Sequence, residues 1–201
     1  MTALQRVATA SALLFLAACA GIPKTDTTPG SWQAQRERIE AINYFTASGK
    51  IALRTAEQAE SASLLWRQLG ESSHLRLSGP MGLSATTVDS NGKQVVMHQG
   101  DETYRWDIGD PALQYTQGLN LPLRALQFWL KGVPAPELEL ERLRLDPAGE
   151  LPLSLQQQGW QVEYQGFATF EGYILPTRLE VSRDDTNARI ILRQWKGITA
   201  P

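Results

Sequence analysis

Few side chains in this sequence combine the type and the spacing that catalysis or metal binding requires. The only histidines, His74 and His98, are far apart in the sequence, and neither has a cysteine or a carboxylate at the spacing of metal ligands. Ser78 is not part of a GxSxG elbow, the usual signature of a hydrolase nucleophile. The pair Asp184-Asp185 lies in a polar stretch that is typical of a solvated turn. We therefore expect no catalytic residue, no metal site and no enzymatic activity.

Cys19 is the exception, because its surroundings predict a covalent modification. The residues before it carry one positive charge, Arg6, and then an apolar run from Val7 to Ala18 without an acidic residue, which is the layout of a secretory signal peptide. This run ends in Leu16-Ala17-Ala18-Cys19, which resembles the lipobox cleaved by the bacterial lipoprotein signal peptidase. Cleavage there leaves the thiol of Cys19 to carry a diacylglyceryl thioether, and its freed amine to take a third acyl chain. A disulfide is the alternative, but the chain has no second cysteine.

These acyl chains predict where the protein resides. Two or three chains hold a protein to a bilayer almost permanently, whereas the apolar run itself is shorter than the roughly 20 residues that a membrane-spanning helix needs. Ala20 stands where similar enterobacterial lipoproteins that stay at the inner membrane carry an aspartate. We therefore expect a protein that is anchored by lipid in the outer membrane and faces the periplasm.

The composition fits one folded domain behind a tether. Removal of residues 1–18 as a lipoprotein signal peptide leaves 201 − 18 = 183 residues with a formal charge of 18 − 21 = −3. This weakly acidic balance gives no support to nucleic-acid binding. Residues 19–31 comprise the lipidated N-terminus and a Pro-, Gly- and Thr-rich stretch, which we interpret as a flexible tether. Residues 32–201 then form the folded domain, which has no cysteine and depends on core burial for its stability.

Local patterns predict a first helix followed by many short strands. Ser31 is suited to cap an amphipathic helix in which Trp32, Ile39, Ile42 and Phe45 lie near one face. From residue 47 onward the apolar residues alternate with neighbours on the opposite face, as in half-buried strands. The alternating groups are Ile51/Leu53, Leu75/Leu77, Trp160/Val162/Tyr164, Leu179/Val181 and Ile190/Leu192.

Turn residues refine this picture. Asn91-Gly92, between residues 84–89 and 94–99, predicts a hairpin with a type I′ turn, which needs a positive φ at both positions. Prolines and glycines between residues 110 and 132 predict a short helix over 111–118 and a second over 122–130. The second helix has a broad apolar face, formed by Leu123, Leu126, Trp129 and Leu130. A curved antiparallel sheet with a few helices on one side follows.

The interior of this sheet has two interpretations. The second helix either covers the end of a packed β core or forms a lid over a lipid cavity. The six tryptophans bring large apolar surfaces, and most of them are expected in the core. An apolar concave face fits both a packed core and a cavity for acyl chains, and the residue pattern does not separate the two.

Four segments in order resemble one known family. They are SGPMGLSATTV from Ser78 to Val88, GLNLPLRALQFWLKGVPAP from Gly118 to Pro136, LPTRLEV from Leu175 to Val181, and LRQWKGI from Leu192 to Ile198. Together with the lipobox they resemble the outer-membrane lipoprotein receptors of the LolB family, from about Trp32 to Ile198. The resemblance implies a half-open antiparallel β-barrel with a helical lid over an apolar cavity, a fold shared with the periplasmic carrier LolA.

The resemblance also implies a function and its partners. A LolB-type receptor accepts lipoproteins from LolA and inserts them into the inner leaflet of the outer membrane. The expected partners are therefore LolA, the acylated cargo and outer-membrane phospholipid, with the receptor as a monomer and without a cofactor. We expect the cargo acyl chains between sheet and lid, and the candidate cavity residues are Trp66, Leu126, Trp129 and Trp160.

The turn Pro80-Met81-Gly82 is the candidate membrane-insertion loop. Proline and glycine break helices and strands on either side of one apolar side chain, which is costly in water and useful against lipid. In the LolB family the matching loop tip is a protruding leucine that membrane insertion of the cargo needs, and this sequence has a methionine of similar volume. The alternative places Met81 in the core near Leu83.

Three other functions fit the same elements. A free-lipid binding lipoprotein would share the cavity, although the SGPMG loop argues against it. A structural envelope lipoprotein that stabilises a membrane complex would have a packed interior and an exposed apolar patch on the convex face. A lipid-processing enzyme would place His74 or His98 next to a serine or carboxylate in a cleft.

Overall fold

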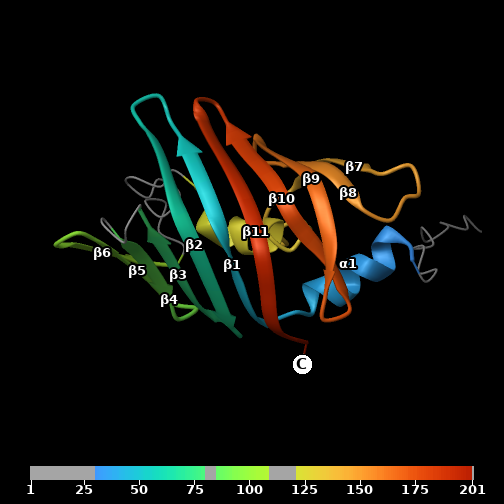
Figure 1. The fold of residues 1–201 in the computed structure, drawn as a ribbon, viewed down its shortest axis with the longest axis horizontal. Helices are drawn as coiled ribbons and strands as arrows, with labels where there is room; N and C mark the ends of the chain where they lie inside the picture. The colour runs from blue at the N-terminus through green and yellow to red at the C-terminus, as the bar shows by residue number, and fades with distance from the viewer. Residues whose placement is uncertain (1–29, 80–84, 109–120, 201) are drawn as a thin grey trace, which may run out of the picture.

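The computed structural model describes residues 30–79, 85–108 and 121–200, which form one antiparallel sheet of eleven strands and two short helices (Figure 1). The strands are β1 (Tyr44–Arg54), β2 (Ala59–Leu69), β3 (Ser72–Ser78), β4 (Thr86–Ser90), β5 (Gln94–Gln99), β6 (Glu102–Asp107), β7 (Leu140–Leu145), β8 (Pro152–Gln157), β9 (Trp160–Phe170), β10 (Tyr173–Arg183) and β11 (Thr186–Thr199). Their order across the sheet is β6-β5-β4-β3-β2-β1-β11-β10-β9-β8-β7.

The sheet consists of two meanders that meet at its centre. Strands β1 to β6 pair each with the next, strands β7 to β11 do the same, and β1 pairs with β11. The sheet is not closed, because β6 and β7 end it on opposite sides. The predicted mainly antiparallel β fold with a few helices is confirmed. At the central pair a register shift follows Ser48, and a Cβ on Gly49 would lie 1.9 Å from the carbonyl oxygen of Ile191, so only glycine fits this bulge.

Alternate residues along the strands converge on one core. All the alternating apolar groups predicted from the sequence are buried, and they lie on the face of the sheet that we call the inner face. Five of the six tryptophans belong to the same core, and Trp106 packs against it from β6. The strand prediction succeeded here because a period of two needs only local information.

The first helix, α1 (Trp32–Glu40), begins where the sequence predicts. The Ser31 hydroxyl accepts a hydrogen bond from the backbone N–H of Ala34 at 3.3 Å. The prediction placed Ile42 and Phe45 on the same face of this helix, which is wrong, because the helix ends at Glu40 and Phe45 belongs to β1. The helix lies beside the β7–β8 and β9–β10 turns, since Trp32 N–H donates to the Gly149 carbonyl and Arg38 donates to the Gly172 carbonyl.

The second helix, α2 (Leu123–Trp129), confirms the helix predicted over residues 122–130. Strands β1 and β11 pass in front of it in Figure 1, so it lies on the inner face of the sheet. The helix predicted over residues 111–118 lies outside the described residues.

The hairpin turns correct one prediction. Strands β4 and β5 do form the hairpin around Asn91-Gly92, but only Gly92 has a positive φ, and the turn is not type I′. The Asn91 side-chain oxygen instead accepts from the N–H groups of Lys93 and Gln94, so Asn91 stabilises a longer turn. Both positions have positive φ at Gln158-Gly159 and at Glu171-Gly172, which connect β8–β9 and β9–β10.

Candidate functional site

The site is built around α2, which lies across the inner face of the sheet. Pro122 precedes the helix and fixes its entry, and Gly132, with a φ of 86°, turns the chain out of it. Ala125, Leu126 and Trp129 face the core and are almost fully buried. Leu123 and Phe128 are only partly buried and line open space on both sides of the helix. The sheet thus has a covering helix, with one packed face and one face next to cavities.

Gln157 fixes the C-terminal end of this covering helix. Its side chain is fully buried and makes four hydrogen bonds. The oxygen accepts from Trp129 Nε1 at 2.8 Å and from Ala135 N at 2.9 Å, and the nitrogen donates to the carbonyls of Ala135 at 2.9 Å and Leu138 at 2.8 Å. An amide has two donors and two acceptor sites, so this buried group is completely satisfied. One side chain from β8 therefore holds the whole connection after α2.

Tyr164 adds a second contact at the same end. Its hydroxyl donates to the Trp129 carbonyl at 3.0 Å, and burial raises the pKa of this hydroxyl far above its ordinary value. The Tyr164 hydroxyl therefore stays protonated and acts as a donor. The Trp129 ring also packs against Trp160 from β9, with ring centroids 6.1 Å apart. Side chains from strands β8 and β9 thus hold the last turn of α2 against the inner face of the sheet.

Lys131 ties the same end to α1. Its ammonium nitrogen donates to the carbonyls of Ile39 at 3.3 Å and Ile42 at 2.9 Å, and it lies 5.2 Å from the centre of the Phe128 ring. Burial lowers the pKa of Lys131 to about 8, and the charge of Glu40 opposes this shift. No carboxylate in the part of the chain that the structure describes forms an ion pair with Lys131. The side chain therefore links the ends of the two helices through backbone carbonyls.

The larger cavity lies between α2 and the strands of the first meander. Its volume is about 270 Å³. The sheet side is apolar, with Phe45, Trp66, Leu75, Val88 and Val95. The helix side consists of Leu123, Arg124, Gln127, Phe128 and Lys131. One end, near the β2–β3 and β4–β5 turns, is polar and includes Asn43, Glu71, Ser73 and Ser90. This cavity can hold an apolar chain while its polar end meets a polar group.

Trp66 presents its ring to this cavity because its N–H is satisfied elsewhere. The indole nitrogen donates to Gln68 Oε1 at 3.0 Å, and the Gln68 amide in turn donates to the Gly70 carbonyl at 2.8 Å. Both side chains come from β2 and both are buried. The wall of the cavity is therefore fixed by hydrogen bonds that run along its own strand.

The smaller cavity lies on the opposite side of α2, above the second meander. Its volume is about 150 Å³. Its wall includes Pro122, Leu138 and Trp160, together with Leu123 and Phe128, which also border the larger cavity. The guanidinium of Arg183 lies 4.6 Å from the centre of the Trp160 ring and closes one side. The helix side chains Leu123, Arg124, Gln127 and Phe128 border both cavities.

The structure divides the predicted cavity residues into two pairs. Trp66 and Trp160 line the larger and the smaller cavity, respectively. Leu126 and Trp129 line neither of these two cavities and pack into the core beneath the helix. The predicted lipidation site Cys19 and the predicted loop Pro80-Met81-Gly82 lie outside the described residues.

Sequence reasoning missed several residues of the site. Phe128 lies between Leu126 and Trp129 of the predicted apolar stripe, and its aromatic side chain within this stripe was the available signal. Lys131 and Gln157 carried no local signal, because their partners are distant in the sequence.

No catalytic arrangement accompanies these cavities. His74 lies 2.7 Å from Asp89, closer to a carboxylate than the sequence indicated, but the pair is exposed and borders neither cavity beside α2. His98 contacts Thr103 on an exposed strand. Among residues 30–79, 85–108 and 121–200 no group of three or more His, Cys, Asp or Glu could hold a metal ion. Over the same ranges no helix is long and apolar enough to cross a bilayer.

Comparison with protein families gives a match over most of the chain. The family described as "Outer membrane lipoprotein LolB" matches residues 43–195. An outer-membrane lipoprotein LolB from Alkalilimnicola ehrlichii is 39% identical over 187 residues, which cover 92% of each chain. A protein of the same name from Chromohalobacter salexigens is 31% identical over 184 residues, which cover 90% of this chain and 85% of that one.

Solved structures with little sequence identity share the fold. A LolA superfamily protein from Nitrosomonas europaea matches with a TM-score of 0.53 and 11% identity, over 85% of this chain and 95% of that chain. An outer membrane lipoprotein-sorting protein domain from Vibrio parahaemolyticus also has a TM-score of 0.53, with 8% identity, over 84% of this chain and 92% of that chain. At such identities the likeness concerns the fold alone.

Proposed function

The chain belongs to the LolB family of outer-membrane lipoproteins, and we propose that it accepts lipoproteins from the periplasmic carrier LolA and inserts them into the inner leaflet of the outer membrane. LolB proteins are lipoprotein receptors and not enzymes, which confirms the prediction that the chain is not an enzyme. The observation that carries the proposal is the covering helix, which has cavities on both sides and lies against an apolar sheet face.

The cargo acyl chains enter beside α2 in this proposal. The two cavities, of about 270 and 150 Å³, share Leu123 and Phe128 as a partition. Ligand pockets usually measure about 300 to 1,000 Å³, so two or three acyl chains need more space than either cavity offers. Movement of the partition would join the two cavities into one. Trp66 and Trp160 then form opposite walls, while Leu126 and Trp129 remain in the floor.

The transfer needs no nucleotide. If the apolar space beside α2 binds acyl chains only ~1.4 kcal/mol more tightly than the carrier does, cargo passes to the receptor with a tenfold bias. The anchor and the loop complete the proposal. Acyl chains on Cys19 keep the receptor at the outer membrane and facing the periplasm, and the apolar side chain of Met81, between Pro80 and Gly82, assists insertion of the cargo into the bilayer.

A transfer assay tests the cavity. Purified LolA loaded with an acylated lipoprotein is mixed with the receptor, and cargo on each protein is measured after separation. Phe128→Glu places a carboxylate between the two cavities and should lower capture by about tenfold or more, because a buried charge costs several kcal/mol. Leu140→Glu is the matched control, since Leu140 is an exposed apolar residue on β7, away from both cavities. Equal capture by both variants would remove the cavities from the proposal.

The loop is tested in the second half of the same assay. Met81→Glu should capture cargo as well as the unchanged protein does, but should fail to deliver it to outer-membrane vesicles. Undiminished delivery would leave the loop without a role, and loss of capture would assign Met81 to the binding step instead.

A structural envelope lipoprotein is the second candidate. Such a protein would have an exposed apolar patch on the convex face, and Tyr44, Leu69 and Ile191 are exposed on β1, β2 and β11. These side chains lie among cations. An apolar partner protein in an envelope complex would not match such a mixed surface.

A further inference from the structure

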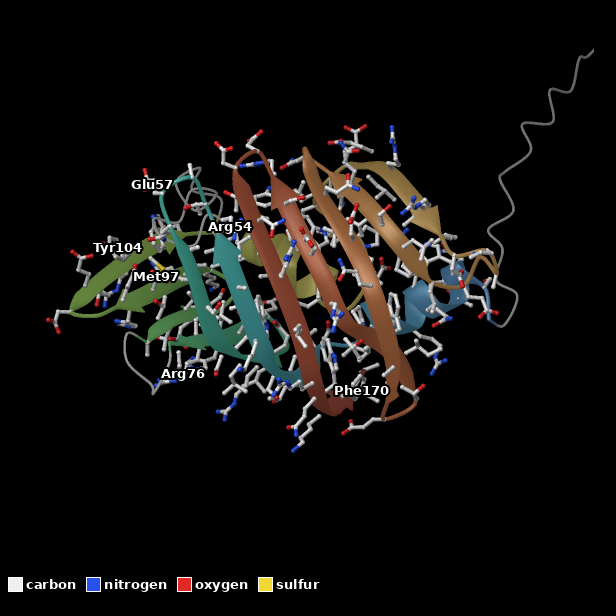
Figure 2. All side chains as sticks on the ribbon, turned by 45° about the horizontal axis from the view of Figure 1, so that its top comes forward. Arg54, Glu57, Arg76, Met97, Tyr104 and Phe170 are labelled. Carbon is white, nitrogen blue, oxygen red and sulfur yellow. The ribbon has the colours of Figure 1, made fainter. Side chains whose placement is uncertain are left out.

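The outer face of the sheet, opposite α2, carries a concentration of cations at its centre. Exposed basic residues alternate with the buried core residues of five adjacent strands, β3, β2, β1, β11 and β10. We call this group the basic face, and it consists of Lys50, Arg67, Arg76, Arg178, Arg193 and Lys196. Figure 2 shows nitrogen-tipped side chains on this face, with Arg76 labelled at one border. Five strands span about 20 Å, so the cations cover a broad surface and not a single point.

These six cations have no ion-pair partner among the residues that the structure describes. Two of the carboxylates on the same side are already engaged, and a third, the exposed Glu163 on β9, accepts from Gln161 at 3.4 Å. Glu180 accepts from Arg189 and Asn187, and Asp89 accepts from His74. The formal charge of the whole chain is −2, so positive charge is segregated onto this surface of an acidic protein. Uncompensated cations of one sign over a broad area attract an anionic surface.

Apolar side chains are interspersed with the cations. The structure describes four exposed large apolar residues, and three of them, Tyr44, Leu69 and Ile191, lie on the same face. Tyr44 and Leu69 are opposite each other in the β1–β2 register, with 45% and 63% of their surfaces exposed. Ile191 lies opposite both Lys50 and Arg178. Cations mixed with exposed apolar and aromatic side chains fit a bilayer interface, where head groups and the acyl boundary meet.

We propose that the basic face docks on the head groups of anionic phospholipids. The family to which the chain belongs consists of outer-membrane lipoproteins, so a bilayer is always within reach. Because α2 and both cavities lie on the other side of the sheet, docking turns the cavities away from the bilayer and toward the aqueous space. The sheet then rests flat on the membrane, in the orientation that exposes the cavities.

Vesicle binding tests this proposal without the lipid anchor. The mature chain, residues 19–201 with Cys19→Ala, has neither the apolar signal segment nor a cysteine that can be acylated. Its binding to vesicles of phosphatidylcholine is compared with its binding to phosphatidylcholine mixed with phosphatidylglycerol. We expect binding to the anionic vesicles to be stronger by about tenfold or more at low salt, and this preference to fall steeply when the ionic strength is raised. Equal binding to both kinds of vesicle would overturn the proposal.

Two charge-reversal variants distinguish the effect of the basic face from the effect of the protein's net charge. The triple variant Arg67→Glu, Arg76→Glu, Lys196→Glu should lose the preference for anionic vesicles by about tenfold or more. The control triple Arg105→Glu, Arg142→Glu, Arg144→Glu makes the same change of charge at the exposed cations of the edge strands β6 and β7 and should lose far less. An equal loss in both triples would show that only total charge matters.

Two further measurements address misfolding of the variants and binding of a protein partner. If the first triple variant does not fold, as judged by circular dichroism, the neutral pair Arg67→Gln, Lys196→Gln replaces it, with Arg142→Gln, Arg144→Gln as control. Binding of the carrier LolA is measured on all variants. Weaker carrier binding with unchanged vesicle binding would assign the basic face to a protein partner and overturn the proposal. Failure of vesicle binding leaves the cavity proposal intact, since acyl capture occurs on the opposite side of the sheet.

Discussion

The two ends of the covering helix α2 are held in very different ways. At its C-terminal end Gln157, Tyr164 and Lys131 together form hydrogen bonds that join it to β8, β9 and, through the Ile39 carbonyl, α1. At its N-terminal end Pro122 offers no side-chain cap, and the exposed ion pair between Arg124 and Glu137 is the main polar link. Any enlargement of the cavities must therefore begin at the N-terminal end, with the C-terminal end as the fixed point.

The difference between the two ends matters for the acyl-chain binding proposed above. A helix held firmly at both ends would keep the two cavities separate and small, and a helix free at both ends would expose the apolar inner face to water. Buried hydrogen bonds at one end keep the helix in place, because leaving such groups unpaired is expensive. At the other end Leu123 is only partly buried, so its further exposure costs little.

Loss of Gln157 should have the largest effect on this arrangement. Gln157→Leu leaves buried donors and acceptors on Trp129, Ala135 and Leu138 without partners, and we expect the free energy of unfolding to fall by about 4 kcal/mol or more. Chemical denaturation followed by tryptophan fluorescence measures the change. The control is Gln127→Leu, a glutamine on α2 that borders both cavities and should cost less than about 1 kcal/mol. Similar losses of unfolding free energy in both variants would contradict the conclusion that Gln157 fixes the C-terminal end of α2.

Lys131 should make stability depend on pH in the alkaline range. Its pKa is about 8 in the folded protein and has the ordinary lysine value of 10.5 in the unfolded chain, so between these values the unfolded chain binds more protons than the folded one. The free energy of unfolding should therefore rise with pH across this window, by about 3 kcal/mol in total. The neutral amine still donates to the carbonyls of Ile39 and Ile42, so the helix link survives.

The Lys131→Met variant isolates this contribution. All other titratable groups are the same in both proteins, and the difference between wild type and variant removes their contribution. We expect the stability of the wild type to increase relative to Lys131→Met as the pH rises from 8 to 10.5, and to stay constant relative to it below pH 8. A difference that does not change with pH would show that Lys131 is not buried as the structure has it.

The fixed end of α2 also marks the limit of what the sequence predicts. Helix and strand positions were largely predictable, because periods of 3.6 and 2 are local properties. Gln157 lies in a strand with no distinguishing neighbours, and its partners are 19 to 28 residues away. Its role depends on tertiary contacts that no local pattern contains. The same holds for Lys131, whose two acceptors are 89 and 92 residues away.

The cavity residues were half predictable for a related reason. The apolar stripe of α2 indicated that the helix lies on something apolar, and it does. The stripe does not say which residues meet the packed core and which meet open space, because both surroundings favour apolar side chains. Leu126 and Trp129 were therefore grouped with Trp66 and Trp160, although only the latter two line the cavities. Leu126 packs into the core with 1% of its surface exposed. A Leu126→Glu variant should therefore destabilise the fold, and not weaken acyl binding alone.

Two leucines at opposite ends of α2, its first residue Leu123 and its C-cap Leu130, allow a direct comparison of these ends. Leu130, at the fixed end, is fully buried, and Leu130→Ala should lower the free energy of unfolding by about 3 kcal/mol. Leu123 is partly buried between the cavities, and Leu123→Ala should cost only about 1 kcal/mol. Binding of a fluorescent fatty acid, in contrast, should change in Leu123→Ala and not in a folded Leu130→Ala protein. Equal stability losses would mean that both ends are packed alike.

The smallest effect is expected from the Arg124–Glu137 ion pair, which links the first turn of α2 to the segment before β7. Both side chains are about half exposed, at 42% and 56%, so solvent screens their attraction. A double-mutant cycle with Arg124→Gln and Glu137→Gln should give a coupling of at most about 0.5 kcal/mol, and added salt should reduce it. A coupling above about 1.5 kcal/mol, comparable with a buried hydrogen bond, would show that the N-terminal end is also held firmly. Enlargement of the cavities would then require a movement other than displacement of this end, since both ends of the helix would resist it alike.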